Sequence, residues 1–166
     1  MKKLLYLFLI FASFGISAQT TAEDFNKLGN SKVHLEDYYG AIVEYTKAIE
    51  LDPDFAMAYV NRGTAKKRLE DYSAAIVDYS KAIAFDPNFV KAYYFRGLSR
   101  NDLKDYYGAI ADFTKAIELD PVFSEAYYDR CLSKYRLGDT NGACEDARKA
   151  EDLGRDASKF INSECT

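Results

Sequence analysis

Apolar residues recur along this chain at intervals of three and four, which is the period of an amphipathic α-helix. The pattern is clearest between residues 56 and 85, where it stops near residue 70 and then resumes. The first stretch contains Tyr59, Gly63 and Leu69, and the second contains Tyr72, Ala75, Ile76, Tyr79, Ala82 and Ile83. Because the interruption is only a few residues long, the pattern predicts two helices joined by a tight turn.

This helical pair repeats along the chain with a period of 34 residues. The segment DYYGAI at Asp37–Ile42 returns unchanged at Asp105–Ile110, and a close copy, DYSAAI, lies midway at Asp71–Ile76. A fixed period of this length is typical of stacked repeats that bury a shared core. The period predicts units at residues 22–55, 56–89, 90–123 and 124–157, with a capping helix and tail at 158–166.

Helix ends are marked by aspartates on the same period. Four of them stand where a second helix should begin, and each carboxylate can cap free backbone amides: Asp37, Asp71, Asp105 and Asp139. The Asp52-Pro53 pair and its two equivalents are expected to start the following first helices, with Asp as the cap and Pro in the first helical position. A short last helix, from about Asp156 to Glu164, should cover the end of the stack.

The spaced residues resemble the tetratricopeptide repeat family. In its pattern the fourth residue is bulky, the eighth small, the twentieth Ala, the twenty-fourth aromatic, the twenty-seventh Ala and the thirty-second Pro; the second unit matches with Tyr59, Gly63, Ala75, Tyr79, Ala82 and Pro87. The first and third units match at the same places. The fourth departs at Cys131, Ala147 and Arg155, as expected of a terminal unit. The resemblance implies an all-α fold: a right-handed α-solenoid of four helix-turn-helix repeats plus a C-terminal capping helix.

In this family the first helices line a concave groove that binds extended or helical peptides. The resemblance places these residues in the groove: Asn30, Asn61, Arg68, Lys91, Tyr94, Phe95, Tyr128, Tyr135 and Arg136. Aromatic rings among cations suit the apolar side chains and acidic groups of a peptide. We expect the four aromatic residues of this set to be exposed in one area.

One subset of the family clamps a C-terminal carboxylate with five residues. Three of those places match here, at Asn30, Asn61 and Lys91. Asn26 stands where a lysine is expected and Phe95 where an arginine is expected. Since both flanking charges are missing, we do not expect a true carboxylate clamp.

An arginine stands in each of the last three units where the family pattern usually has leucine: Arg62, Arg96 and Arg130. A partly buried guanidinium needs an acid, and acids recur on the second helices. Pairing within a unit would join Arg62 to Asp78, and pairing across units would join it to Glu44. Both alternatives stay open, and either produces a structural ladder.

Three cysteines, Cys131, Cys144 and Cys165, allow one disulfide and one free thiol. Cys144 occupies the place held by isoleucine in the other units, on a face that meets the next helix, and Cys165 lies on the expected capping helix. The close of the chain also resembles exported bacterial proteins of the family. Position and resemblance both favour a Cys144–Cys165 bridge that holds the cap, and the alternative is three small buried residues.

The first 18 residues form a separate segment. Two lysines precede an apolar run, Leu4–Phe14, and small residues follow in Gly15–Ala18. This order is typical of a secretory signal peptide, cut before Gln19. The stretch from Leu4 to Ala18 is about 15 residues long where a membrane span needs about 20, so an uncleaved anchor is the less favoured alternative. We therefore expect a periplasmic or secreted protein with no membrane span after cleavage.

The net charge and the residue types present reduce the number of functions that the sequence allows. Without the signal peptide the chain has 20 Lys+Arg against 26 Asp+Glu, a formal charge of −6, which does not favour nucleic acid as a partner. The single histidine, His34, and the lack of a phosphate-binding loop or paired Cys-x-x-Cys predict no enzyme activity, no cofactor and no metal site. We expect a scaffold that binds a protein or peptide in its groove. The alternative is a structural subunit of a cell-envelope complex, or a self-associating array that uses the convex face or open ends.

Overall fold

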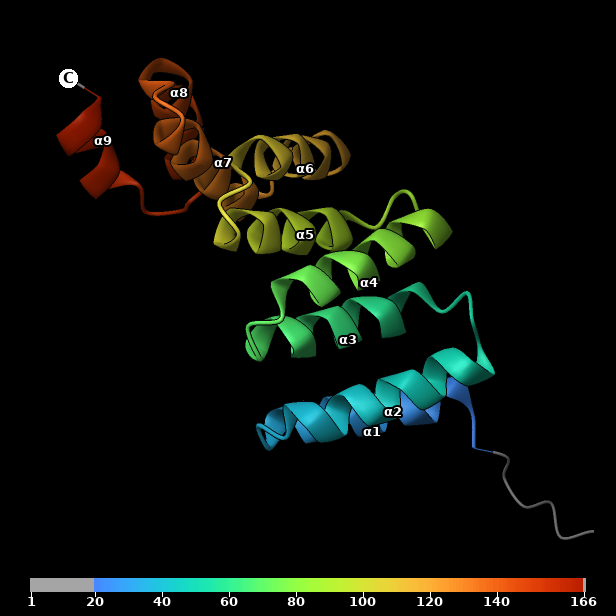
Figure 1. Ribbon diagram of the computed structural model, residues 1–166. Coiled ribbons are helices and arrows are strands. Elements are labelled where there is room, and N and C mark those ends of the chain that lie inside the picture. The colour runs from blue at the N-terminus through green and yellow to red at the C-terminus, as the bar shows by residue number, and fades with distance from the viewer. Residues whose placement is uncertain (1–19, 166) are drawn as a thin grey trace, which may run out of the picture.

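The computed structural model describes residues 20–165, and in that range the chain forms nine α-helices (Figure 1). The predicted signal peptide lies outside the described residues. The helices are α1 (Ala22–His34), α2 (Tyr38–Leu51), α3 (Ala56–Arg68), α4 (Tyr72–Phe85), α5 (Val90–Asp102), α6 (Tyr106–Leu119), α7 (Ser124–Arg136), α8 (Thr140–Asp152) and α9 (Ser158–Glu164).

Successive helices form antiparallel pairs, α1 with α2 through α7 with α8, and the pairs stack one on the next (Figure 1). The first helix of each pair begins at the predicted first residue of a unit: Ala22, Ala56, Val90 and Ser124. The short α9 packs against α8 at the end of the stack. The predicted solenoid of four repeats with a capping helix is confirmed.

The second helices are capped as predicted, whereas the first helices are not. The carboxylate of Asp105 accepts a hydrogen bond from the backbone N–H of Gly108, and the other three aspartates cap in the same way. Asp52, however, ends α2, and α3 begins only at Ala56. The Asp52 carboxylate accepts from the N–H of Asp54 at 3.2 Å, which closes a turn around Pro53. The prediction that each Asp-Pro pair starts a helix was therefore wrong.

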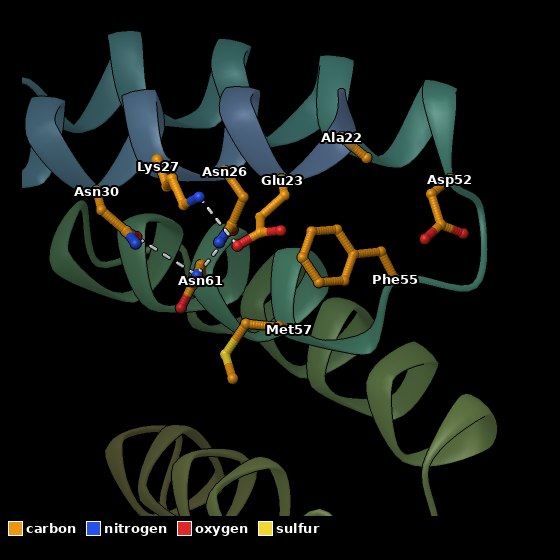
Figure 2. Close-up of a pocket in the computed structure, with 9 residues that line it drawn as sticks. All are labelled: Ala22, Glu23, Asn26, Lys27, Asn30, Asp52, Phe55, Met57 and Asn61. Carbon is orange, nitrogen blue, oxygen red and sulfur yellow. Dashed lines mark hydrogen bonds and ion pairs between the residues drawn. The ribbon is translucent and has the colours of Figure 1, made fainter. Parts of the chain in front are cut away.

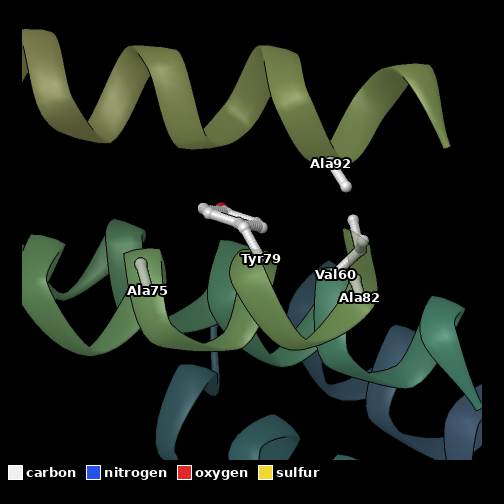
Figure 3. Close-up of a cluster of buried hydrophobic side chains, with 5 residues drawn as sticks. All are labelled: Val60, Ala75, Tyr79, Ala82 and Ala92. Carbon is white, nitrogen blue, oxygen red and sulfur yellow. The ribbon is translucent and has the colours of Figure 1, made fainter. Parts of the chain in front are cut away.

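An aromatic ring in each second helix fills the space beside a glycine in the first. A Cβ atom added to Gly97 would lie 2.7 Å from Cε1 of Phe113, so no larger residue fits without movement. Tyr79 has the same place in the second pair, where it lies between α4 and the next first helix, α5 (Figure 3). Each ring thus packs both its own pair and the following one.

A buried ion pair joins the two helices of each of the last three pairs. In the third pair, Arg96 donates to both carboxylate oxygens of Asp112, which is 3% exposed, at 2.7 and 3.0 Å. Its remaining Nη1 donates to the Ser80 hydroxyl of the preceding pair at 3.0 Å. Arg62 and Arg130 make the same set of contacts. The acid therefore comes from the same unit, and the arginine also reaches the unit before it.

The two ends of the stack differ from its middle. At the C-terminal end Cys144 and Cys165 form a disulfide, which joins α9 to α8. Phe160 and Ile161 of α9 pack over a cluster that contains the fully buried Cys131. Burial raises the pKa of the Cys131 thiol to about 12, which leaves it protonated and unreactive. At the N-terminal end the exposed Asp24 stands where later first helices bury an alanine, so this end does not offer a packing surface for another repeat.

The ion pairs should contribute strongly to stability because their carboxylates are buried. We expect Arg96→Met to lower the free energy of unfolding by about 2–3 kcal/mol, since it leaves Asp112 buried with Arg100 as its only cation. A matched control is Lys115→Met on the same helix as Asp112, which removes an exposed ion pair with Glu118. Urea denaturation measures both. Equal losses for the two variants would contradict a structural role for the buried pair.

The disulfide should hold α9 in place, because α9 has only seven residues and lacks a side-chain cap. Alkylation under denaturing conditions without reductant should modify Cys131 alone, and reduction should make all three thiols reactive by intact mass. Reduction should also remove about 3 kcal/mol of stabilisation and expose the bond after Lys159 to trypsin. Cys131→Ala serves as the control that keeps the bridge. Three alkylated thiols before reduction would show that the bridge does not form.

Candidate functional site

The first helices lie on the inner side of the curved stack. Successive first helices, α1 with α3, α3 with α5 and α5 with α7, contact one another, whereas within residues 20–165 successive second helices do not. Since the pairs are closer on one side than on the other, the stack curves around its first helices. The predicted groove residues therefore belong to the concave surface.

A cavity of about 610 Å³ opens on this surface between α1 and α3 (Figure 2). Its lining consists of Ala22, Glu23, Asn26, Lys27, Asn30, Asp52, Phe55, Met57 and Asn61. Two of the predicted groove residues, Asn30 and Asn61, thus lie in one site. Phe55 and Met57 form an apolar wall next to the asparagines (Figure 2).

The three asparagines of the cavity form a connected amide cluster. Asn61 donates from Nδ2 to Oδ1 of Asn26 at 2.9 Å and to Oδ1 of Asn30 at 3.4 Å (Figure 2). The hydroxyl of Tyr45 also donates to Oδ1 of Asn30, at 2.8 Å. Burial raises the pKa of Tyr45 to about 12, so this phenol stays protonated and keeps donating. The carbonyl of Asn30 is thereby held toward the protein, which leaves its NH₂ group for the cavity.

The cavity exists because a small amide stands where a later unit has a large ring. Asn26 corresponds on the 34-residue period to Tyr94, and Phe55 corresponds to Phe123. Tyr94 packs on Phe123 with 4.7 Å between ring centroids, and its hydroxyl donates to Asp129 at 2.8 Å. At the equivalent place Asn26 accepts a hydrogen bond from Asn61, but its small side chain leaves the space of the phenol ring empty. The same place on the scaffold is therefore filled between α5 and α7 and open between α1 and α3.

The cavity is lined by one basic residue, Lys27, and that residue is paired with an acid. The ammonium group of Lys27 lies 3.0 Å from the carboxylate of Glu23, and Asp52 adds a second negative charge. Because both side chains of the Lys27–Glu23 pair are exposed to water, the pair contributes little to stability, and with Asp52 the sum of the three charges is negative. The site is thus suited to neutral groups better than to a carboxylate.

The C-terminal half of the groove is occupied by the protein's own contacts. Phe95 packs between Tyr79 and Tyr94, and the Arg155 guanidinium covers the ring of Tyr128 at 5.0 Å. Tyr135 donates its hydroxyl to Glu164 and meets Phe160 of α9 edge to face. The expectation of four exposed aromatic residues was wrong in part, because neighbouring units and α9 cover them: only Tyr135 is exposed, at 37%, and the other three are half-buried.

Three predicted cations, Arg68, Lys91 and Arg136, are exposed, but none of them lines the cavity. The sequence prediction also missed Phe55 and Met57. Phe55 precedes α3, outside the places that the family pattern assigns to the groove, whereas Met57 has the same place as the predicted Lys91 but was not named. A signal was present, since Phe55, Phe89 and Phe123 follow the 34-residue period. Among the described residues, no helix combines the length and the apolar character that crossing a membrane requires.

Comparisons with known proteins give the family. Models of the tetratricopeptide repeat match residues 56–89 and 90–123, and a related repeat model matches residues 29–70. A search of curated protein sequences returned no match.

Solved structures show the same fold. The crystal structure of MamA is 28% identical, with a TM-score of 0.77 over 81% of this chain and 78% of MamA. A MamA fragment from Desulfovibrio magneticus RS-1, 24% identical with a TM-score of 0.75 over 81% of this chain and 76% of that one, is similar in fold. The first tetratricopeptide domain of Spaghetti (RPAP3), bound to the HSP90 peptide SRMEEVD, is 30% identical, with a TM-score of 0.70 over 71% of this chain and 96% of that domain.

The repeat models together cover residues 29–123, and the stacked helix pairs continue on both sides of that range. The chain belongs to the tetratricopeptide repeat family.

Proposed function

We propose that this protein is an exported scaffold that binds a segment of a partner protein in its concave groove. The observation that carries the proposal is the cavity between α1 and α3, which combines an apolar wall with a cluster of amides on the inner surface. The repeat domain of RPAP3 bound to an HSP90 peptide supports peptide binding by a related fold. The N-terminal sequence supports export to the periplasm or the cell exterior.

The stack favours recognition by a preformed surface. The arginine of each buried ion pair joins its unit to the one before it, and each aromatic ring packs two neighbouring pairs. A groove that is already in its binding shape loses little conformational entropy when a segment docks. Catalysis is not part of the proposal.

A second candidate is a structural subunit that is fixed in a complex through the convex face. It is favoured by exposed apolar side chains on the second helices, Tyr39 at 74%, Val43 at 52%, Val77 at 59% and Tyr107 at 77%. Attachment through the ends of the stack is disfavoured, since Asp24 stands at one end and α9 covers the other.

Site-specific photo-crosslinking separates the two candidates. A benzophenone amino acid at Met57 would sample the cavity, and the same group at Val77 would sample the convex face; both side chains are exposed, at 44% and 59%. In cells that make the protein naturally, we expect a defined partner protein to crosslink from position 57 and not from position 77. Capture from position 77 alone would contradict groove binding and support the structural subunit.

A further inference from the structure

We propose that the cavity between α1 and α3 binds the main chain of an internal, extended segment of its partner, with one bulky apolar side chain of that segment against Phe55 and Met57. The inference rests on the proposed function and adds the chemical class of the ligand. It assigns the site to a peptide that needs no free C-terminal carboxylate.

The first support is an amide whose NH₂ group is unused and open to the cavity. Asn26 is 7% exposed, and within residues 20–165 its Nδ2 makes no hydrogen bond, although its Oδ1 accepts from Asn61. In the described range no buried side-chain nitrogen or oxygen lacks a partner, so this NH₂ group is open to water in the cavity, where an acceptor of a ligand can take the place of that water. Asn26 lines the cavity, and its side chain lies beside Asn61 there (Figure 2).

The neighbouring amides of Asn30 and Asn61 provide further hydrogen-bonding groups beside this donor. Contacts among the described residues use Oδ1 of Asn30 and Nδ2 of Asn61, and leave Nδ2 of Asn30 and Oδ1 of Asn61 without a protein partner. The cavity thus offers two donors and one acceptor. An extended peptide presents carbonyl and N–H groups side by side, and neutral amides pair with both. This arrangement recognises main chain and does not depend on a ligand charge.

The second support is the charge of the site. A terminal carboxylate needs a free cation or several donors directed at it. The cation of this cavity, Lys27, is paired with Glu23, and Asp52 would repel an anion. The family members that bind a terminal carboxylate have cations at two positions where this chain has Asn26 and Phe95. Asn26 is buried, and the ring of Phe95 packs against Tyr79. The ligand is therefore an uncharged stretch within a chain.

The apolar wall sets the side-chain preference. Phe55 is half-buried, and Met57 is 44% exposed, on the side of the cavity next to Asn61 (Figure 2). A Met side chain is flexible and polarizable, and it adapts to differently shaped apolar groups. We expect a bulky apolar residue at one position of the ligand and little selection among Leu, Met and Phe.

The protein's own third unit suggests the variant that tests the site. Since Tyr94 occupies the corresponding space between α5 and α7, Asn26→Tyr should fill the cavity while its hydroxyl reaches Asn61. The scaffold accommodates tyrosine at that place, so the variant should fold. Asn61→Ala is a second variant that removes two hydrogen bonds of the cluster, and Asn141→Ala, an exposed amide on α8, is the matched control.

The probe is a library of random ten-residue peptides displayed at the N-terminus of a carrier, so that no peptide has a free carboxylate. Selection against the purified protein should enrich sequences with one bulky apolar residue. Synthetic copies with an amidated or a free C-terminus should bind with equal Kd in calorimetry. Asn26→Tyr, with wild-type thermal unfolding, and Asn61→Ala, with a small loss of stability, should each weaken binding at least about tenfold, whereas Asn141→Ala should leave the Kd unchanged.

Several results would overturn the inference. The first is that a selected peptide binds at least about tenfold more tightly with a free C-terminal carboxylate than with an amidated one. The second is that the peptide SRMEEVD, with its free C-terminus, binds as tightly as the selected peptides. Either result would indicate a site for a terminal carboxylate. Enriched peptides that bind Asn26→Tyr and Asn61→Ala as tightly as wild type would exclude this cavity, although groove binding elsewhere would survive. A library that yields no specific binder would overturn the peptide assignment. Failure of the proposed function itself is distinct, because it appears as crosslinking from the convex face alone.

Discussion

The buried carboxylates of the second helices impose the constraint on which the rest of the structure depends. Asp78, Asp112 and Asp146 are each less than 5% exposed, so each needs a cation and a full set of hydrogen bonds. The arginine that satisfies each acid also donates to a hydroxyl of the preceding unit. One guanidinium therefore fixes the two helices of a pair and the distance to the pair before it. The first unit lacks this arginine, and there Glu44 pairs with Lys47.

The candidate site arises where the sequence departs from its own repeat. Glycines beside aromatic rings and aspartate caps recur with little change, and they build the stack. On the inner surface, Asn26 and Tyr94 occupy equivalent places but have opposite effects, because one opens a cavity and the other fills it. Identical scaffolds with different groove residues allow one fold to bind unrelated ligands. Here the difference restricts the open part of the groove to its N-terminal half.

Much of the fold could be predicted from the sequence, because the 34-residue period and the aspartate caps act locally. The starts of all eight repeat helices followed from them, except that the Asp52-Pro53 turn was taken for a helix start. The site was harder to predict. Exposure of Tyr94 and Tyr128 depends on Phe123 and Arg155, which stand at the far ends of the same units and meet those rings only in the folded stack. The choice between ion pairs within and across units likewise required the three-dimensional arrangement.

The central claim is that the amides between α1 and α3 contact the main chain of a bound segment. Side-chain amide signals in two-dimensional ¹⁵N–¹H NMR test it directly, because each asparagine NH₂ gives its own pair of peaks. On addition of a selected, C-terminally amidated peptide, the account predicts that the NH₂ peaks of Asn26, Asn30 and Asn61 shift while those of Asn88 and Asn141 stay in place. Unchanged peaks for the three cavity asparagines at saturating peptide would contradict it.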